Sequence, residues 1–288
     1  MSKVDDISTA FEALGNTLKS VAKVLLQSRR CDVGAEARPE NDSIIIMGNG
    51  PSLSDTIATY GDVLRTHTTL AVNYAANAEE FFDLKPRYYV MVDPAFFDPN
   101  PGENLKRLRE TFAKRVDWPM TIFVPAVNRG SFDLQGNPNV TVRTINSVGL
   151  EGFGWFERMA YGRRWGTPRP RNVLIPSIMV AIWLGFKKIY LVGADHSWMR
   201  TLEVNEQNEV VSVQPHFYKD NESARKWNAA IFKTVRLHEV VHSYYVAFKA
   251  YFSIKKFADS KNVMIYNSTP GSFIDAFPRK SLADLPVG

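Results

Sequence analysis

The sequence predicts an α/β protein with a Rossmann-like, doubly wound and mostly parallel sheet. Short apolar runs alternate along the chain with segments of helical periodicity. Several of these runs lack any polar alternation, which is typical of strands buried on both faces of a sheet. Polar residues follow the runs directly, where the strands of such a sheet end. The length of 288 residues suits one large domain with an insertion.

The chain divides into three parts. Residues 1–42 are expected to form an N-terminal amphipathic helix followed by a polar linker, and residues 43–275 to form the Rossmann-like domain. Within that domain, a stretch without periodicity at about 196–225 predicts a lid over the site. Residues 276–288 form a C-terminal tail. No internal repeat or low-complexity tract interrupts this organisation.

The first expected strand ends in a glycine turn. Apolar residues fill 44–47, and Gly48, Asn49 and Gly50 follow at once. The two glycines permit a tight turn and close approach of a ligand to the backbone, and Ser52 or Ser54 is placed to cap the amides of a following helix. The G-x-G spacing matches neither the dinucleotide fingerprint nor a Walker loop. A plain strand-to-helix turn and a phosphate-binding cradle therefore both stay open.

The remaining elements follow the same alternation. Further strands are expected at 68–73, 88–92, 120–124, 140–145, 188–192 and 262–266. Helices are expected at 56–66, 104–116, 172–185 and 226–258, the last as two helices broken near His242. The stretch 127–172 is rich in glycine, aromatic residues and arginine outside its one strand. It predicts a surface loop held by its aromatic side chains, with stacking of tryptophan and arginine on a base or sugar as the less common alternative.

Polar residues stand at equivalent positions after several of these strands. Asn49, Asn73 and Asp93 follow the first three, where ligands gather in α/β sheets. Asp195 and His196 follow the strand at 188–192. Asp195 is equally consistent with a site residue and with a cap for the next segment, and His196 is a secondary candidate for ligand contact.

The N-terminal segment has an apolar face. Ile7, Phe11, Leu14, Leu18, Val21 and Leu25 recur at helical spacing. Such a helix can dock on the core, pair with another subunit as a homo-oligomer, or lie on an anionic membrane. Docking or pairing is the commoner outcome.

Composition excludes several classes. No run approaches the ~18 apolar residues of a membrane span, and the N-terminus lacks the pattern of a secretion signal, so a cytoplasmic location is expected, with peripheral contact at the inner membrane as an option. Cys31 is the one cysteine, which excludes an internal disulfide and a cysteine metal cluster. The net charge of +5 is spread along the chain, which favours an anionic ligand or membrane surface and no nucleic-acid partner.

Three segments together resemble a known family. GNGPSL after the first strand, VAIWLGFKKIYLVGAD, and NVMIYNSTPGS are similar to the bacterial lipooligosaccharide sialyltransferases of the single-domain, Rossmann-like type. They also resemble the related MptE-like family of 6-hydroxymethylpterin diphosphokinases. The resemblance covers most of 43–275 and is weakest over 96–170. It implies a glycosyltransferase of surface-polysaccharide synthesis that uses a CMP-activated sugar and a glycan acceptor, with neither a cofactor nor a metal ion.

The resemblance also assigns nucleotide-binding positions. Asn49 matches the asparagine that contacts the nucleotide phosphate or ribose, and Asn73 matches the asparagine after the second strand. Asp93 stands where the family has another asparagine. An acid beside phosphates repels them unless a cation intervenes, so this departure favours a different nucleotide or the diphosphokinase relatives, which use Mg²⁺. The cytidine-binding serine has no exact partner here, and Ser177 lies one turn later.

Catalytic roles are carried over in the same way. The family's catalytic histidine falls on His242, where it would act as the general base that removes the proton from the acceptor hydroxyl, a task suited to a side chain that titrates near neutral pH. Tyr218 is the best-placed match for the lid tyrosines that assist departure of the phosphate.

His238 and His242 also form a literal H-E-x-x-H motif with Glu239. A zincin requires a third ligand downstream, and neither histidine nor glutamate follows residue 242. A zinc site is therefore the weaker interpretation, and no metal ligand is assigned.

Two other functions stay open at this point. One is a diphosphokinase-type enzyme in which Asp93 and Asp195 organise Mg²⁺ and ATP. The other is a non-catalytic subunit that binds a nucleotide or glycan.

Overall fold

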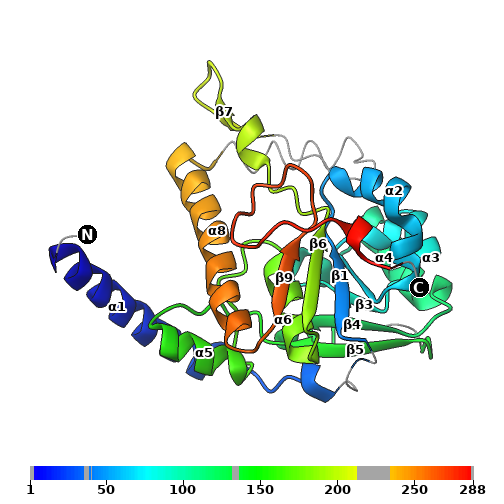
Figure 1. Cartoon of the computed structure of the whole chain (residues 1–288), viewed down its shortest axis with the longest axis horizontal. Coiled ribbons are helices and arrows are strands. Elements are labelled where there is room, and N and C mark those ends of the chain that lie inside the picture. The colour runs from blue at the N-terminus through cyan, green and yellow to red at the C-terminus, as the bar shows by residue number, and fades with distance from the viewer. Residues whose placement is uncertain (1–2, 36–38, 40, 132–135, 213–233, 287–288) are drawn as a thin grey trace.

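The protein forms three layers, with a seven-stranded sheet between two layers of helices (Figure 1). The computed structural model describes residues 3–35, 39, 41–131, 136–212 and 234–286. Every strand pair in the large sheet is parallel. The predicted α/β, Rossmann-like fold with an N-terminal helix is confirmed.

The strands of the sheet lie in the order β5-β4-β3-β2-β1-β6-β9. Their bounds are β1 Ser43–Met47, β2 Thr69–Val72, β3 Tyr88–Val90, β4 Met120–Pro125, β5 Val140–Ile145, β6 Lys188–Val192 and β9 Met264–Asn267. The chain therefore runs outward from β1 to β5 and returns to the other side of β1. This change of direction places the topological switch point between β1 and β6, where ligands of doubly wound sheets bind.

The register of β1 and β6 brings their ends together. Met47 pairs with Val192, so the turns that follow these two residues leave the sheet side by side. Each β1 side chain from Ile44 to Met47 is buried. Ile44 and Ile46 face one helical layer and Ile45 and Met47 the other, which explains the unbroken apolar run.

The helices divide between the two faces. The layer formed by α5, α6 and α8 covers the face of Ile44, and the layer formed by α2, α3 and α4 covers the face of Ile45. The bounds are α1 Lys3–Gln27, α2 Ser52–Thr66, α3 Glu80–Leu84, α4 Glu103–Glu110, α5 Gly154–Gly162, α6 Leu174–Leu184 and α8 Leu237–Asp259. A π-helical turn, Thr111–Arg115, continues α4. Together, α4 and this turn correspond to the helix expected at 104–116. In the described part of the chain, no helix has the length and apolar character needed to cross a membrane.

Two local expectations are wrong, and the polar linker has a contact that the sequence did not predict. The helix α8 runs unbroken through His242, because its buried residues continue at helical spacing from Val240 to Ala258. The aromatic stretch after β5 contains a helix, α5, whose Phe156 and Tyr161 are buried in the core. The polar linker is anchored, since the carboxylate of Asp32 accepts hydrogen bonds from the amide and the hydroxyl of Thr144 on β5.

The segments that flank the last part of the sheet are only partly described. The described portion of the expected lid holds a 3-10 turn, Trp198–Thr201, and an antiparallel hairpin of β7 (Glu203–Val204) and β8 (Val210–Val211). Tyr218 lies outside the described residues. In the C-terminal tail, Phe277 and Leu282 are buried against the core.

Candidate functional site

The turns after β1 and β6 are in direct backbone contact. The amide of Gly48 donates to the carbonyl of Val192, and the amide of Gly50 donates to that of Gly193, both at 2.8 Å. A Cβ on Gly48 would lie 2.5 Å from the Gly193 oxygen, and a Cβ on Gly193 would lie 2.4 Å from the Gly48 oxygen. These glycines therefore let the two turns meet. Contact of Gly48 and Gly50 with a nucleotide stays a prediction.

Gly50 makes room for Asp195. A Cβ on Gly50 would lie 2.0 Å from Asp195 Oδ2, the same oxygen that accepts a hydrogen bond from the Ser52 hydroxyl at 2.8 Å. Burial raises the pKa of the Asp195 carboxyl, and the hydrogen bonds from Ser52 partly offset that effect. Because the Ser52 hydroxyl is committed to Asp195, it does not cap α2, contrary to expectation.

The N-terminus of α2 is left without a side-chain cap. Pro51 occupies the cap position and offers no acceptor. The first amides of a helix carry partial positive charge and lack intrahelical partners. At the switch point, such a terminus favours an anionic group of a ligand.

Asn49 and Asn73 present acceptors beside this helix end. The side-chain amide of Asn49 donates to the carbonyl of Val72 at 3.1 Å, which fixes its orientation and leaves Oδ1 buried without a partner. Oδ1 of Asn73 is also buried and unpartnered. Asn73 has φ of 52°, a left-handed conformation that asparagine tolerates better than most residues, and Tyr89 holds its carbonyl by a hydrogen bond.

A buried chain of hydrogen bonds starts at Asn172, just before α6. Its Oδ1 accepts from the amides of Leu174 at 3.0 Å and Ile175 at 3.3 Å, and from the hydroxyl of Tyr251 on α8 at 3.0 Å. The same tyrosine oxygen lies 2.6 Å from His196 Nε2. The Tyr251 hydroxyl donates its proton to Asn172, so it can only accept a hydrogen bond from His196. Nε2 of His196 is therefore the protonated ring nitrogen. His196 is thereby fixed beside Asp195.

His196 makes the stability of the protein depend on pH. Burial lowers the pKa of His196 from its ordinary 6.5 to about 3. Between these values the unfolded chain binds the proton that the folded protein rejects, so stability rises with pH in this window and is lost as pH falls below 6.5. The loss is at most about 1.4 kcal/mol per pH unit. We expect His196→Asn, which keeps a residue suited to its φ of 50°, to flatten this dependence.

The measurement is the urea concentration at half unfolding, determined at several pH values from about 7.5 to about 5. The exposed His238, changed to asparagine, serves as the control and should leave the wild-type slope intact. Asp195 has a raised pKa, so its contribution to stability falls as pH rises, opposite to that of His196. Because the wild type and His196→Asn both contain Asp195, its contribution cancels when their slopes are compared. Equal slopes in the wild type and His196→Asn would contradict the prediction.

The turn after β9 supports this arrangement. Thr269 Oγ1 accepts from the amide of Ala194 at 3.0 Å and donates to the carbonyl of Leu191, and the Ser272 hydroxyl donates to the Ala194 carbonyl at 2.6 Å. These bonds hold the β6 turn from the side away from β1. The neighbouring Ser268 has a buried hydroxyl oxygen without a partner.

Several of the buried polar side-chain atoms without a hydrogen-bond partner lie at one edge of the sheet. Within the described residues they include Asn49 Oδ1, Asn73 Oδ1, Asn172 Nδ2 and Ser268 Oγ. Each belongs to a segment that follows a parallel strand or precedes a helix at the carboxyl ends of the strands. An unsatisfied buried polar group costs about 1–3 kcal/mol, so a group of them indicates a place prepared for a polar ligand.

The side chains of two residues predicted to contact the nucleotide, Asp93 and Ser177, have protein partners in the structure. Asp93 is exposed and caps the 3-10 turn Pro94–Phe97 by accepting from the Ala95 amide at 2.9 Å. Ser177 is fully buried inside α6, and its hydroxyl donates to the Val173 carbonyl one turn earlier at 2.7 Å. Their contact with a nucleotide stays a prediction.

His242 lies in the second turn of α8 with an exposed side chain, and its ring centre is 6.2 Å from that of Tyr245. Glu239 of the H-E-x-x-H motif is engaged in capping α8, since it accepts from the Arg236 amide at 2.8 Å. Among the described residues no group of three or more His, Cys, Asp or Glu side chains is placed to hold a metal ion. The zinc interpretation therefore lacks a third ligand in this part of the chain.

An aromatic groove of about 590 Å³ runs beside α8. It is lined by Met199, Tyr245, Phe248, Lys249, Phe252, Phe273 and Asp275. Tyr245 joins the groove to His242. The amide of Phe273 donates to the Asp195 carbonyl at 2.9 Å, so the groove borders the strand-end site.

Sequence reasoning missed several residues of this site. The sequence does not single out Asn172, Tyr251 and Ser268, although Asn172 begins the helix expected at 172–185 and Ser268 lies in the segment NVMIYNSTPGS. A signal existed only for Asn172, whose position directly before an apolar helix suits a cap. Tyr251 is one of many aromatic residues in α8 and carries no local mark.

Comparisons with known proteins do not assign this chain to a family. No family model matches the sequence, and no curated protein matches it. Among solved structures there is a likeness to the "Structure of MAf glycosyltransferase from Magnetospirillum magneticum AMB-1", with 12% sequence identity, a TM-score of 0.48 and 87% of this chain covered. The match spans 35% of the length of that protein. A likeness of this size carries no argument about function.

Proposed function

We propose that this protein is a glycosyltransferase that binds an activated nucleotide sugar at the carboxyl ends of β1, β2 and β6. The observation that carries the proposal is the group of unpartnered polar atoms, Asn49 Oδ1, Asn73 Oδ1 and Asn172 Nδ2, around the switch point of a doubly wound sheet. The sugar donor is CMP-linked, as the sequence resemblance implies.

The chemistry of these groups suits a nucleotide. Two amide oxygens accept from ribose hydroxyls or a base amine, and an amide nitrogen donates to a base or hydroxyl oxygen. The uncapped start of α2 stabilises a phosphate. The Asp195 carboxylate disfavours dense negative charge nearby, which fits the single phosphate of a CMP-sugar better than a diphosphate.

The acceptor glycan occupies the aromatic groove beside α8. Sugar rings stack on aromatic faces, while Lys249 and Asp275 bind hydroxyl groups. His242 removes the proton of the acceptor hydroxyl while the oxygen of that hydroxyl forms a bond to the anomeric carbon of the donor. The bond from that carbon to the phosphate oxygen breaks, and the nucleotide leaves with the electron pair. Tyr218 assists this departure.

A thermal-shift screen against CMP, UDP, GDP and ATP, each with Mg²⁺ and with EDTA, tests the proposal. A nucleotide at 100 times its dissociation constant stabilises the folded state by about 2.7 kcal/mol, a shift of roughly a few degrees. We expect CMP to stabilise the protein in EDTA. Stabilisation by ATP with Mg²⁺ alone would favour phosphoryl transfer instead, and no stabilisation by any nucleotide would overturn the proposal. A loss of stability in EDTA alone would favour a metal at His238 and His242.

Asn73→Gly should weaken nucleotide binding without unfolding the protein. It removes the unpartnered Oδ1, and glycine accepts the φ of 52° without strain. We expect a roughly tenfold rise in the nucleotide dissociation constant by calorimetry, the worth of one hydrogen bond. Asn208→Gly, at φ of 57° in the β7–β8 hairpin, is the matched control and should bind normally. Equal affinities in all three proteins would remove Asn73 from the site.

A further inference from the structure

The helix α1 carries its apolar residues on the side that faces solvent. Its N-terminal half extends away from the body of the protein (Figure 1). Large apolar side chains that a core would normally cover are exposed by 40–78%. These residues, here called the α1 stripe, are Ile7 (58%), Phe11 (70%), Leu14 (45%), Leu18 (63%), Val21 (40%) and Leu25 (78%).

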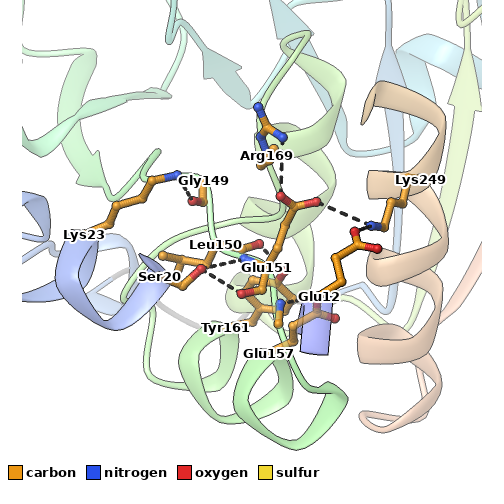
Figure 2. A network of polar contacts seen from close by, with 11 residues as sticks. Glu12, Ser20, Lys23, Gly149, Leu150, Glu151, Glu157, Tyr161, Arg169 and Lys249 are labelled. Atoms are coloured by element: carbon orange, nitrogen blue, oxygen red, sulfur yellow. Dashed lines mark hydrogen bonds and ion pairs between the residues drawn. The ribbon is translucent and has the colours of Figure 1, made fainter. Parts of the chain in front are cut away.

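The polar face of α1 faces the body instead. The Ser20 hydroxyl donates to the Glu151 carbonyl at 2.7 Å, and the Lys23 ammonium donates to that of Gly149 at 3.2 Å (Figure 2). Thr17 accepts from the Phe153 amide at 2.9 Å. A Cβ on Gly152 would lie 2.2 Å from Thr17 Oγ1, so the helix is seated closely. These bonds fix the rotation of α1, and the stripe cannot turn inward without breaking them.

The spacing of the stripe is that of a helix pair. From Ile7 to Leu25 the intervals are alternately four and three residues, a repeat of 3.5 residues. This repeat keeps a narrow seam facing one partner helix, whereas a helix lying on a membrane has a broader apolar face. The residues beside the seam include Gly15 and Ala22, which allow another helix to approach closely.

The charges of the segment distinguish the partner and its direction. Residues 3–12 carry one lysine and three acids, whereas residues 13–30 carry four basic residues and no acid. Two copies side by side in opposite directions place the acidic half of each against the basic half of the other. Residues 3–30 together hold five basic and three acidic residues, an excess of two, which is less than the cluster of basic residues typical of a segment that binds anionic lipid.

We propose that the α1 stripe pairs with the α1 stripe of a second copy of this chain in antiparallel orientation. The stripe matches itself under that symmetry, because Ile7 meets Leu25, Phe11 meets Val21 and Leu14 meets Leu18 at one constant register. The body contacts α1 through Thr17, Ser20 and Lys23 in its C-terminal half and through an ion pair between Lys249 and Glu12 at 3.8 Å, and the α1 stripe stays exposed to its partner. The pairing covers a surface that one chain leaves in water.

Sedimentation velocity over a concentration series tests the pairing. The wild-type chain should sediment at low concentration as a species of 32.6 kDa and at higher concentration as one of twice that mass. Leu18→Glu should raise the dimer dissociation constant by roughly a hundredfold, because each copy then buries a charge against Leu14 of the other, next to the centre of the seam. Leu26→Glu is the matched control, since Leu26 is 72% exposed on the same helix but off the repeat, and it should dimerise normally.

Cross-linking tests the direction. In a Cys31→Ser background, protein with Ile7→Cys and protein with Leu25→Cys should form a disulfide-linked dimer when mixed, and neither alone. Cross-linking of each protein alone would show parallel pairing. A wild-type chain that is monomeric at every concentration would overturn the proposal. So would flotation of the wild type with phosphatidylserine vesicles that Leu18→Glu abolishes.

Discussion

Gly193→Ala is expected to lower the free energy of unfolding by about 2–5 kcal/mol. Gly193 has φ of +59°, which costs an alanine roughly 1–2 kcal/mol. Its Cβ would also lie 2.4 Å from the Gly48 carbonyl oxygen and 3.0 Å from the Leu53 Cβ, and such overpacking typically costs about 1–3 kcal/mol. Neither neighbour is the free end of a flexible side chain, so the turns after β1 and β6 must separate.

Gly185→Ala is the matched control. Gly185 also has positive φ, +100°, at the end of α6, but a Cβ there would meet nothing within 4 Å. This variant should lose only the part of the stability due to backbone conformation, about 1–2 kcal/mol. The difference between the unfolding free energies of the two variants, measured in urea, gives the cost of the Cβ contact separately from the cost of the positive φ. Equal losses would show that the two turns can move apart freely.

The same substitution should impair the site. Separation of the turns displaces Asp195 and the start of α2, because Gly50 is bonded to Gly193 and Ser52 to Asp195. We therefore expect Gly193→Ala to weaken nucleotide binding at temperatures where it is still folded, and Gly185→Ala to bind as the wild type does. Calorimetry on both variants distinguishes this effect from simple instability.

The layout of the sheet could be predicted because its signals are local. The strands at 120–124 and 188–192 are predicted from apolar runs with abrupt ends, and the structure has each of them within one residue. Asn49 and Asn73 could be picked out because each follows a strand. The sequence does not reveal the helix α5, because the helix is short, begins and ends at glycine, and has Glu157 and Arg158 between its apolar residues.

The contacts that complete the site depend on distant parts of the chain. Gly48 meets Gly193, and Asn172 meets Tyr251, only after the sheet has formed. Sequence periodicity identified the apolar face of α1, but not that its polar face would dock through Thr17 and Ser20. Tertiary hydrogen bonds decided that orientation against the usual preference for burying apolar surface.

His242→Ala is expected to lower the rate of sugar transfer by about 10²–10⁴-fold, the usual contribution of a general base. The side chain of His242 is exposed and its ring lies beside Tyr245 of the aromatic groove, where a bound acceptor would present its hydroxyl. Because little packing is lost, the midpoint of unfolding should not change. Nucleotide binding should also persist, since the strand ends supply those contacts.

His238→Ala is the matched control for that result. His238 is exposed on the same helix one turn earlier, and only a metal site would need both histidines. If His242 acts as the base, His238→Ala keeps full activity and His242→Ala does not. Equal losses in the two variants, restored by added zinc, would replace the base with a metal centre. Full activity in His242→Ala would move the proton transfer to another residue and leave the nucleotide site unaffected.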